Sequence, residues 1–539
     1  MPDDVKRELD EAIERILASK SPKKLVVAGP GAGKTTVFRK LLDGSAGSAD
    51  DRLVLTFINN LKADLEGSLG DAAGVFTLHG YCQQLLHRHE GLRGGLSADF
   101  RCYPGLASLI KQDWEYLRRS KAPLFVDLMR HLDCPAEQEN FYLERANYYD
   151  AVDFDDSVYR VQSRLAADGS LTPTYELVLI DEFQDFNRME AAVIDALAEA
   201  SSIVITGDDD QALYSQLRGA SWDHIRAYYE SGDYEIFELP FCMRCPEVIV
   251  AAVGDIITRA RAGNRLDGRI DKPYRYFEPA KGEDSKRYPT IELVETSVQR
   301  GNANYFGQYI EECIRAIPEA DVKLAAEKGE PVALIIGSDP YRRQVREYLE
   351  KKGLVTAAEA PSVSEREQAL EILAEDPQSN LGWRIILSCG DDTVARAIVR
   401  AVALAGTPLA KAIPAADRDA VLKEAEAWAA NRVQEKDDDA PAKGVPPVKV
   451  ASFEASKGAS AQYVFLLGLQ AGDIPRNPAD IKDIEICRFL VGLTRTKKKC
   501  EILVTKRFGD KFKRRSVFLG WIKPVRYSEK KVDAAYWKK

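Results

Sequence analysis

The stretch "KLVVAGPGAGKTT", residues 24–36, decides the fold class. A short apolar run, Leu25–Val27, leads into a glycine-rich turn, and a helical pattern begins at Gly33-Lys34-Thr35. Glycines in such a turn let backbone N–H groups surround phosphates at the N-terminus of the next helix. The eight-residue P-loop pattern begins here at Ala28 instead of glycine, a tolerated variation. We therefore expect an α/β chain that binds a nucleotide through Gly29, Pro30, Gly31, Ala32, Gly33, Lys34, Thr35 and Thr36.

A second apolar strand supplies carboxylates for this nucleotide site. The P-loop pattern predicts that Lys34 reaches the β- and γ-phosphates of ATP and that the Thr35 hydroxyl is a ligand of Mg²⁺. "YELVLIDEFQDFN", residues 175–187, ends its apolar run at Asp181 and Glu182. Asp181 is expected to hold the Mg²⁺ shell, and Glu182 to polarise the attacking water. The distance along the chain between the two motifs is too long for one crossover helix, which predicts an insertion between them.

A third strand, in "SIVITGDDDQALY" (residues 202–214), ends in three aspartates followed by Gln211. Three adjacent acids are costly unless they are solvated or hydrogen-bonded, so this loop is expected to border the phosphate site. Gln211 can both donate and accept a hydrogen bond, which suits a sensor of the γ-phosphate.

Composition excludes several classes of protein. The 539 residues predict three or four domains or subdomains, and 45% hydrophobic with 29% charged residues is typical of a globular chain. No apolar run approaches the ~18 residues that span a bilayer, and the N-terminus has no apolar signal core. We therefore expect a cytoplasmic protein without a membrane partner. The net charge of −9 conceals a basic segment, residues 494–539, with 16 Lys or Arg against 4 Asp or Glu, which favours either a phosphate-backbone contact or a solvated terminus.

The nine scattered cysteines suit reduced thiols better than a disulfide framework. Cys242 and Cys245 form a single CxxC without the second pair that a structural zinc site needs, so zinc is not expected there.

Taken together, the motifs resemble those of the UvrD/Rep/PcrA-like superfamily 1 helicases, in the same order along the chain. The matching stretches, from motif I to motif VI, are "GPGAGKTT" (29–36), "LTFINNLKADL" (55–65), "FTLHGYC" (76–82), "DEFQD" (181–185), "GDDDQALY" (207–214), "LPFCMRCPEVI" (239–249), "VKVASFEASKG" (448–458) and "FLVGLTRTKKKCEILVT" (489–505).

The resemblance implies two RecA-like P-loop domains with parallel sheets, each interrupted by a mainly helical insertion, with ATP between them. Lys34, Asp181, Glu182 and Gln211 of the first domain would be catalytic, and the second domain would add two arginine fingers, Arg244 and Arg495. By the same match, the residues that contact DNA would be Phe57, Thr77, His79 and Tyr214. For Phe57, packing in the core remains an open alternative.

The expected domain organisation alternates between sheet and insertion. The first RecA-like domain takes residues 1–82 and 171–235, around a helical insertion at 83–170. The second takes residues 236–356 and 448–539, the latter with a basic C-terminal tail, around a reduced helical insertion with linker at 357–447.

Four positions depart from the family pattern. A glutamine is missing before the P-loop, which leaves adenine preference open; Gln216-Leu217 replace the stacking aromatic of motif III; Ala459-Ser460 replace Leu-Glu after motif V; and Leu490 replaces a tyrosine of motif VI. These departures spare the ATPase residues but weaken the expectation of efficient unwinding.

The resemblance implies an ATP-dependent translocase on single-stranded DNA, or a 3′–5′ DNA helicase, that uses ATP and Mg²⁺ on single-stranded or tailed duplex DNA. The alternative is a DNA-gated regulatory ATPase subunit of a repair or antiphage complex, partnered with a separate nuclease, as in the Gabija system. A P-loop kinase is disfavoured because it has no use for "DEFQD", "GDDDQ" and two distant arginines.

Overall fold

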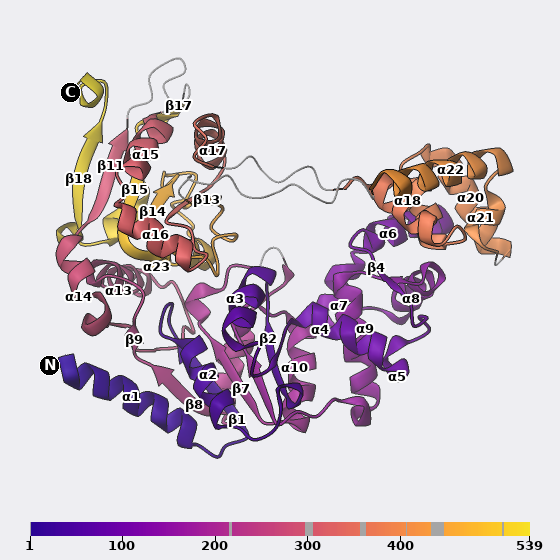
Figure 1. Ribbon diagram of the computed structural model, residues 1–539, viewed down its shortest axis with the longest axis horizontal. Helices are drawn as coiled ribbons and strands as arrows, with labels where there is room; N and C mark the ends of the chain where they lie inside the picture. Colours follow the sequence, from indigo (N-terminus) through magenta and orange to yellow (C-terminus); the bar gives the residue numbers. More distant parts are fainter. Residues whose placement is uncertain are drawn as a thin grey trace.

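The computed structural model describes residues 2–214, 218–296, 305–355, 363–405, 407–432, 447–508 and 511–538. Its two main bodies are six-stranded parallel sheets, each covered by helices on both faces (Figure 1). The predicted fold class, α/β with two RecA-like domains, is confirmed.

The first sheet is built around the strand that precedes the P-loop. Its strand order is β3-β2-β6-β7-β1-β8. The strands are β1 (Lys23–Ala28), β2 (Arg52–Thr56), β3 (Gly74–Thr77), β6 (Leu177–Ile180), β7 (Ile203–Gly207) and β8 (Glu235–Leu239). Their apolar residues are buried on both faces because helices cover both sides, as parallel sheets require.

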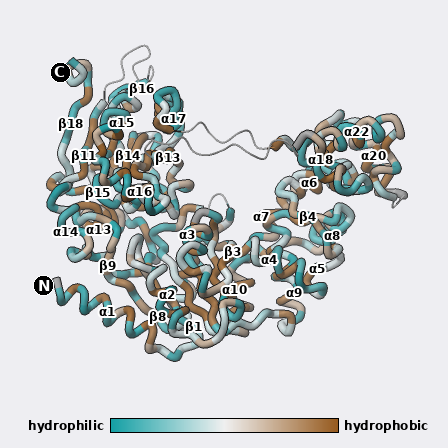
Figure 2. Tube along the Cα trace, viewed as in Figure 1, coloured by the Kyte–Doolittle hydropathy of each residue, from teal (hydrophilic) through white to brown (hydrophobic). Residues whose placement is uncertain are grey.

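Successive residues of β1 belong to different cores. Leu25 and Val27 face one hydrophobic cluster, and Val26 and Ala28 face another, because side chains alternate along a strand. One layer contains α1 (Pro2–Ala18), α2 (Lys34–Gly44) and α3 (Asn59–Leu69); the other contains α4 (Leu78–Arg88), α10 (Arg188–Ala200) and α12 (Asp223–Ser231). Hydrophobic residues follow the central strands of both domains in Figure 2.

The second sheet has the order β13-β12-β14-β15-β11-β18. Its strands are β11 (Ile291–Thr296), β12 (Ala333–Gly337), β13 (Val448–Ala451), β14 (Ala461–Leu467), β15 (Thr496–Thr505) and β18 (Tyr527–Val532). One face packs on α13 (Glu247–Ala262) and α23 (Asp483–Thr494), and the other on α15 (Tyr305–Arg315), α16 (Glu319–Glu327) and α17 (Tyr341–Lys351).

The two insertions are helical and lie against each other (Figure 1). The first contains α5 (Glu90–Arg93), α6 (Leu106–Arg118), α7 (Phe125–His131), α8 (Ala136–Tyr149) and α9 (Phe154–Ala167). The second contains α18 (Glu365–Glu375), α19 (Asn380–Ser388), α20 (Asp392–Ala405), α21 (Leu409–Ala412) and α22 (Ala415–Arg432). Their buried side chains form one continuous cluster that includes Trp383.

Two details differ from the expected organisation. The boundary expected at residue 235 cuts the first sheet, because β8 pairs with β1 along its whole length, to Leu239. The basic C-terminal segment is largely folded instead of forming a tail: β15 is a central strand, and β18 pairs with β11. Several of its cations are neutralised within the domain, as when Lys499 pairs with Glu501 and Arg515 with Glu529. Among the described helices, none is long and apolar enough to cross a membrane.

Candidate nucleotide and nucleic-acid sites

The P-loop runs from the end of β1 to the first residue of α2. Gly31 and Gly33 have positive φ angles of 74° and 89°, which side chains rarely adopt. They also make room for the second domain: a Cβ at Gly31 would lie 2.4 Å from Cβ of Arg244, and one at Gly33 would lie 2.3 Å from Cε of Met243. The glycines therefore serve both the turn and the contact with the CxxC segment.

A cavity of about 550 Å³ lies over this loop, between the two domains. The predicted catalytic residues Lys34, Asp181, Glu182, Gln211, Arg244 and Arg495 all line it, as do Pro30, Gly31, Ala32, Gly33 and Thr35. Gly29 and Thr36 do not; a Cβ at Gly29 would lie 2.5 Å from the ring of Tyr274. One cavity thus brings together residues that lie hundreds of positions apart in the sequence.

Lys34 is paired with the two carboxylates that follow β6. Its Nζ lies 2.5 Å from Oε1 of Glu182 and 3.8 Å from Oδ1 of Asp181, which also accepts a hydrogen bond of 2.9 Å from the Thr206 hydroxyl. Burial raises the pKa of Asp181, an effect that Lys34 partly offsets. Burial alone would also raise the pKa of Glu182, but Lys34 and Lys457 hold it well below its ordinary value. Glu182 is therefore a charged carboxylate.

The backbone holds Glu182 in an uncommon conformation. Its φ of 54° is in the left-handed region, where a non-glycine residue is strained by ~1–3 kcal/mol. The Gln184 amide donates a hydrogen bond of 2.6 Å to Oε2 of Glu182, which fixes the carboxylate. Such strain is typical of active sites, where it holds a side chain in its working position.

Gln211 connects the two domains at the cavity. Its Oε1 accepts a hydrogen bond of 2.9 Å from Arg495, and its own amide donates one of 2.8 Å to Asp208. Lys457 of motif V, a residue that sequence reasoning missed, donates 2.7 Å to the backbone oxygen of Gln211 and also pairs with Asp185. Burial and the nearby Arg244 lower the pKa of Arg495 to about 10, so the guanidinium remains charged at neutral pH.

The donor set fits Mg²⁺ and a triphosphate. Thr35 and Asp181 offer the oxygen ligands that Mg²⁺ prefers, and both line the cavity together with the glycine turn. Lys34, Arg244 and Arg495 face the same space with positive charge. The cavity is therefore suited to an anionic nucleotide held from both domains.

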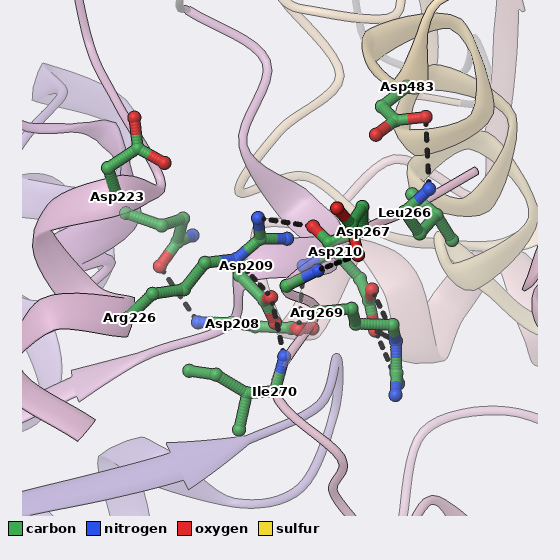
Figure 3. A network of polar contacts seen from close by, with 12 residues as sticks. Asp208, Asp209, Asp210, Asp223, Arg226, Leu266, Asp267, Arg269, Ile270 and Asp483 are labelled. Carbon is green, nitrogen blue, oxygen red and sulfur yellow. Dashed lines mark hydrogen bonds and ion pairs between the residues drawn. The ribbon is translucent and has the colours of Figure 1, made fainter. Parts of the chain in front are cut away.

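The three aspartates after β7 are buried and ion-paired, not solvated (Figure 3). Lys272 lies within 3.0 Å of a carboxylate oxygen of each, at 2.9, 2.5 and 3.0 Å from Asp208, Asp209 and Asp210. Arg269 binds Asp210 with two nitrogens. These partners, from the segment between α13 and β10 (Arg275–Tyr276), use the oxygens that a metal ion would need. We call Asp208, Asp209, Asp210, Arg269 and Lys272 the clamp, because these ion pairs hold the loop that precedes Gln211. The two cations could not be predicted from the sequence, since no local motif marks them.

A second cavity, of about 510 Å³, brings together the four predicted DNA contacts. Phe57, Thr77, His79 and Tyr214 line it, and so do two residues that the motif match did not select, Phe154 and Arg218. Phe154 is exposed beside His79, with their ring centroids 6.1 Å apart. Phe154 belongs to the run "DFDD", residues 153–156, at the start of α9.

Phe57 is both a core residue and a lining residue. Only 3% of it is exposed, and its ring packs against Phe186 and Tyr214, so the packing alternative describes most of its surface. The guanidinium of Arg218 lies 4.9 Å above the same ring and donates a hydrogen bond of 2.8 Å to Nε2 of His79. Burial and Arg218 lower the pKa of His79 to about 3, so the imidazole is neutral and its Nε2 accepts this hydrogen bond.

Of the four departures, one lies outside the described residues: Gln216-Leu217 of motif III. Ser460 lines the nucleotide cavity, and Leu490 is buried in the core of the second domain.

Comparison with known proteins agrees with this geometry. The family model described as the UvrD/REP helicase N-terminal domain matches residues 9–113 and 135–232, which contain the P-loop, Asp181, Glu182 and Gln211. Residues 9–113 and 135–232 are similar to the UvrD/REP helicase N-terminal domain. The resemblance to UvrD/Rep/PcrA-like superfamily 1 helicases is thereby confirmed, and the matched residues contain every strand of the first sheet except β8, with much of the first insertion.

The curated proteins that resemble this chain include several DNA helicases. The ATP-dependent DNA helicase UvrD1 of Mycobacterium leprae (strain TN) is 25% identical over 341 residues, 51% of this chain and 43% of that protein. DNA helicase II of Escherichia coli (strain K12) is 26% identical over 54% of this chain and 46% of its own length. The ATP-dependent DNA helicase PcrA of Staphylococcus epidermidis (strain ATCC 35984) is 24% identical over 56% and 47%. The matched part of the chain spans less than half the length of these relatives.

Proposed function

We propose that this protein is an ATP-dependent DNA helicase that couples hydrolysis to 3′–5′ movement along single-stranded DNA. One observation carries the proposal. Arg495 of the second domain meets Gln211 of the first, in the cavity that holds Lys34 and Glu182. The catalytic set is complete only when the two domains approach, so hydrolysis is tied to domain movement.

The residues divide the chemistry among themselves. Lys34 donates a hydrogen bond to Glu182. Phosphate oxygens would compete for Lys34 and leave Glu182 free to orient a water molecule and accept its proton. Arg495 and Arg244 would neutralise the charge that spreads over the transferring phosphoryl group. Thr35 and Asp181 would hold Mg²⁺, which would supply further positive charge at this site.

Motif III links this chemistry to the second cavity. Gln211 lines the nucleotide cavity, and three residues later Tyr214 lines the aromatic cavity and donates a hydrogen bond of 3.0 Å to the backbone oxygen of Glu454 in the second domain. An aromatic groove with an arginine is the type of surface on which bases of single-stranded nucleic acid stack. Domain movement at Gln211 would therefore shift the surface that contacts DNA.

The reduced second insertion favours a second candidate, a DNA-gated ATPase subunit with weak unwinding that works with a separate nuclease. Its helices α19 and α20 pack on the first insertion, and Arg384 of α19 pairs with the buried Asp113. A fixed insertion would limit the rearrangements that drive strand separation. In this second candidate function, the chain would work with a nuclease in a repair or antiphage complex.

Two assays separate the candidates. The first compares steady-state ATPase rates with and without single-stranded DNA, and the second follows strand displacement on 3′-tailed and 5′-tailed duplexes. Stimulated hydrolysis with displacement of the 3′-tailed duplex alone supports the helicase. Stimulated hydrolysis without displacement supports the gated subunit. Lys34→Ala is the negative control, and turnover unchanged in that variant would refute the nucleotide site.

A further inference from the structure

Two buried thiols bracket one of the proposed arginine fingers. Cys242 ends β9 (Phe241–Cys242), and Cys245 follows three residues later, just before α13. Both thiols are fully buried, and the backbone N–H of Cys245 donates a hydrogen bond of 3.4 Å to the Cys242 sulfur. Met243 and Arg244 are the two residues between them. The mechanism proposed above uses neither thiol.

The pair is chemically asymmetric. Burial by itself would raise the pKa of the Cys242 thiol, but hydrogen bonds from the Cys245 thiol, the Tyr274 hydroxyl and the local backbone bring it to about 6. Burial and the neighbouring Cys242 raise the pKa of Cys245 well above its ordinary value. A thiolate next to a protonated thiol at a helix N-terminus is the arrangement in which Cys-x-x-Cys pairs react with oxidants.

The turn between the thiols touches both halves of the nucleotide site. A Cβ at Gly31 would lie 3.3 Å from the Cys242 sulfur, and the backbone N–H of Met243 donates a hydrogen bond of 2.9 Å to the Gly31 oxygen. On the other side, the Cys245 thiol lies 3.5 Å from the backbone oxygen of Thr494, which precedes Arg495. A change in the conformation of this turn would therefore shift the P-loop, Arg244 and Arg495.

We propose that Cys242 and Cys245 form a reversible disulfide that displaces Arg244 and lowers ATP hydrolysis. The backbone N–H of Cys245 lies 3.4 Å from the Cys242 sulfur, and an S–S bond of ~2.05 Å would replace this hydrogen bond and change the turn that holds Arg244. The effect on hydrolysis rests on the function proposed above, whereas formation of the disulfide does not.

The oxidant is a peroxide. The Cys242 thiolate attacks one peroxide oxygen, the O–O bond breaks, and a sulfenic acid and one water form after proton uptake. The Cys245 sulfur then attacks the Cys242 sulfur, the S–O bond breaks, and the hydroxide leaves as water with the Cys245 proton. In total the two thiols lose two electrons and two protons, and one hydrogen peroxide becomes two waters.

The test leaves ATP out while the full chain is treated, so that no nucleotide holds the two domains together over the buried thiols. After exposure to hydrogen peroxide, peptide mapping should show a Cys242–Cys245 peptide lighter by the ~2 Da of two lost protons. ATP turnover should fall at least ~10-fold, because a displaced arginine finger loses much of its ~10³-fold contribution, and dithiothreitol should restore it.

Each variant is compared with its own untreated sample. Cys242→Ser and Cys245→Ser should lose the sensitivity to peroxide, whereas a double Cys102→Ser, Cys389→Ser variant, which removes two exposed thiols, should keep it. The proposal is overturned if mapping finds no such disulfide, if the disulfide forms without loss of turnover, or if Cys245→Ser is inactivated like the wild type. A chain that hydrolyses no ATP before treatment would refute the proposed function, and the mapping would still decide the disulfide.

Discussion

At the scale of single residues, Arg495 is the most informative side chain in the nucleotide cavity. It is buried, it keeps its charge, and it reaches Gln211 across the domain boundary. Arg495→Ala should lower kcat by ~10³-fold or more while ATP binding changes little, because an arginine finger acts mainly in the transition state. The measurement is kcat together with the Kd of a fluorescent ATP analogue. A loss of only a few-fold in kcat would rule out the finger role.

Asp153 is a second residue of interest, because its raised pKa makes folding stability depend on pH. It caps α9, accepts a hydrogen bond of 2.7 Å from the Tyr142 hydroxyl, and burial together with Asp156 raises its pKa to about 7. The unfolded chain releases this proton near the ordinary pKa of 3.8, so the folded state binds more protons between about pH 4 and 7. Folding stability contributed by Asp153 is therefore complete below this window and is lost as the pH rises through it.

Asp153→Asn removes the titration but keeps an oxygen for the cap. The Tm of the variant should fall less than that of the wild type between pH 5 and pH 8, measured by thermal denaturation. Identical pH profiles would show that Asp153 does not carry a raised pKa in the folded protein.

At the scale of elements, the clamp behind motif III holds β7 and its loop against the segment before β10. Lys272 is the cation shared by Asp208, Asp209 and Asp210, and all four side chains are buried. Lys272→Met should cost ~3–5 kcal/mol of unfolding free energy, because it leaves buried carboxylates without their shared partner. It should also lower kcat, since Asp208 positions the amide of Gln211.

The measurements are Tm and kcat, with Lys286→Met as the control. Lys286 also pairs with a carboxylate, that of Glu283, but the pair is exposed, so its loss should leave Tm and kcat unchanged. Equal effects from the two variants would contradict the clamp.

At the scale of the whole molecule, the two insertions form one helical unit although they come from different RecA-like domains. Asp113 on α6 binds Arg145 of its own insertion at 2.8 Å and Arg384 of the other insertion at 2.9 Å, all of them buried. Arg384→Met should loosen the second insertion, because breaking a buried ion pair leaves Asp113 incompletely paired. Hydrogen exchange should then accelerate in α18–α22 while the strands of both sheets keep their protection.

Arg366→Met is the matched control, because its pair with Glu424 lies within the second insertion and is partly exposed. Unchanged exchange in the Arg384 variant would contradict the single helical unit. Faster exchange accompanied by stronger strand displacement would show that the fixed insertion restrains unwinding.

The sequence by itself determined the P-loop, the strands that precede Asp181 and Gln211, and the order of the motifs, because each depends on neighbouring residues and on side-chain periodicity. Only the tertiary structure decided which distant groups meet. Arg495 reaches Gln211, Lys272 neutralises three aspartates, Arg384 pairs with Asp113, and the basic C-terminal segment becomes a central strand and an edge strand. The physical reason is that buried charges require partners at contact distance, and the fold brings those partners from elements that no local pattern connects.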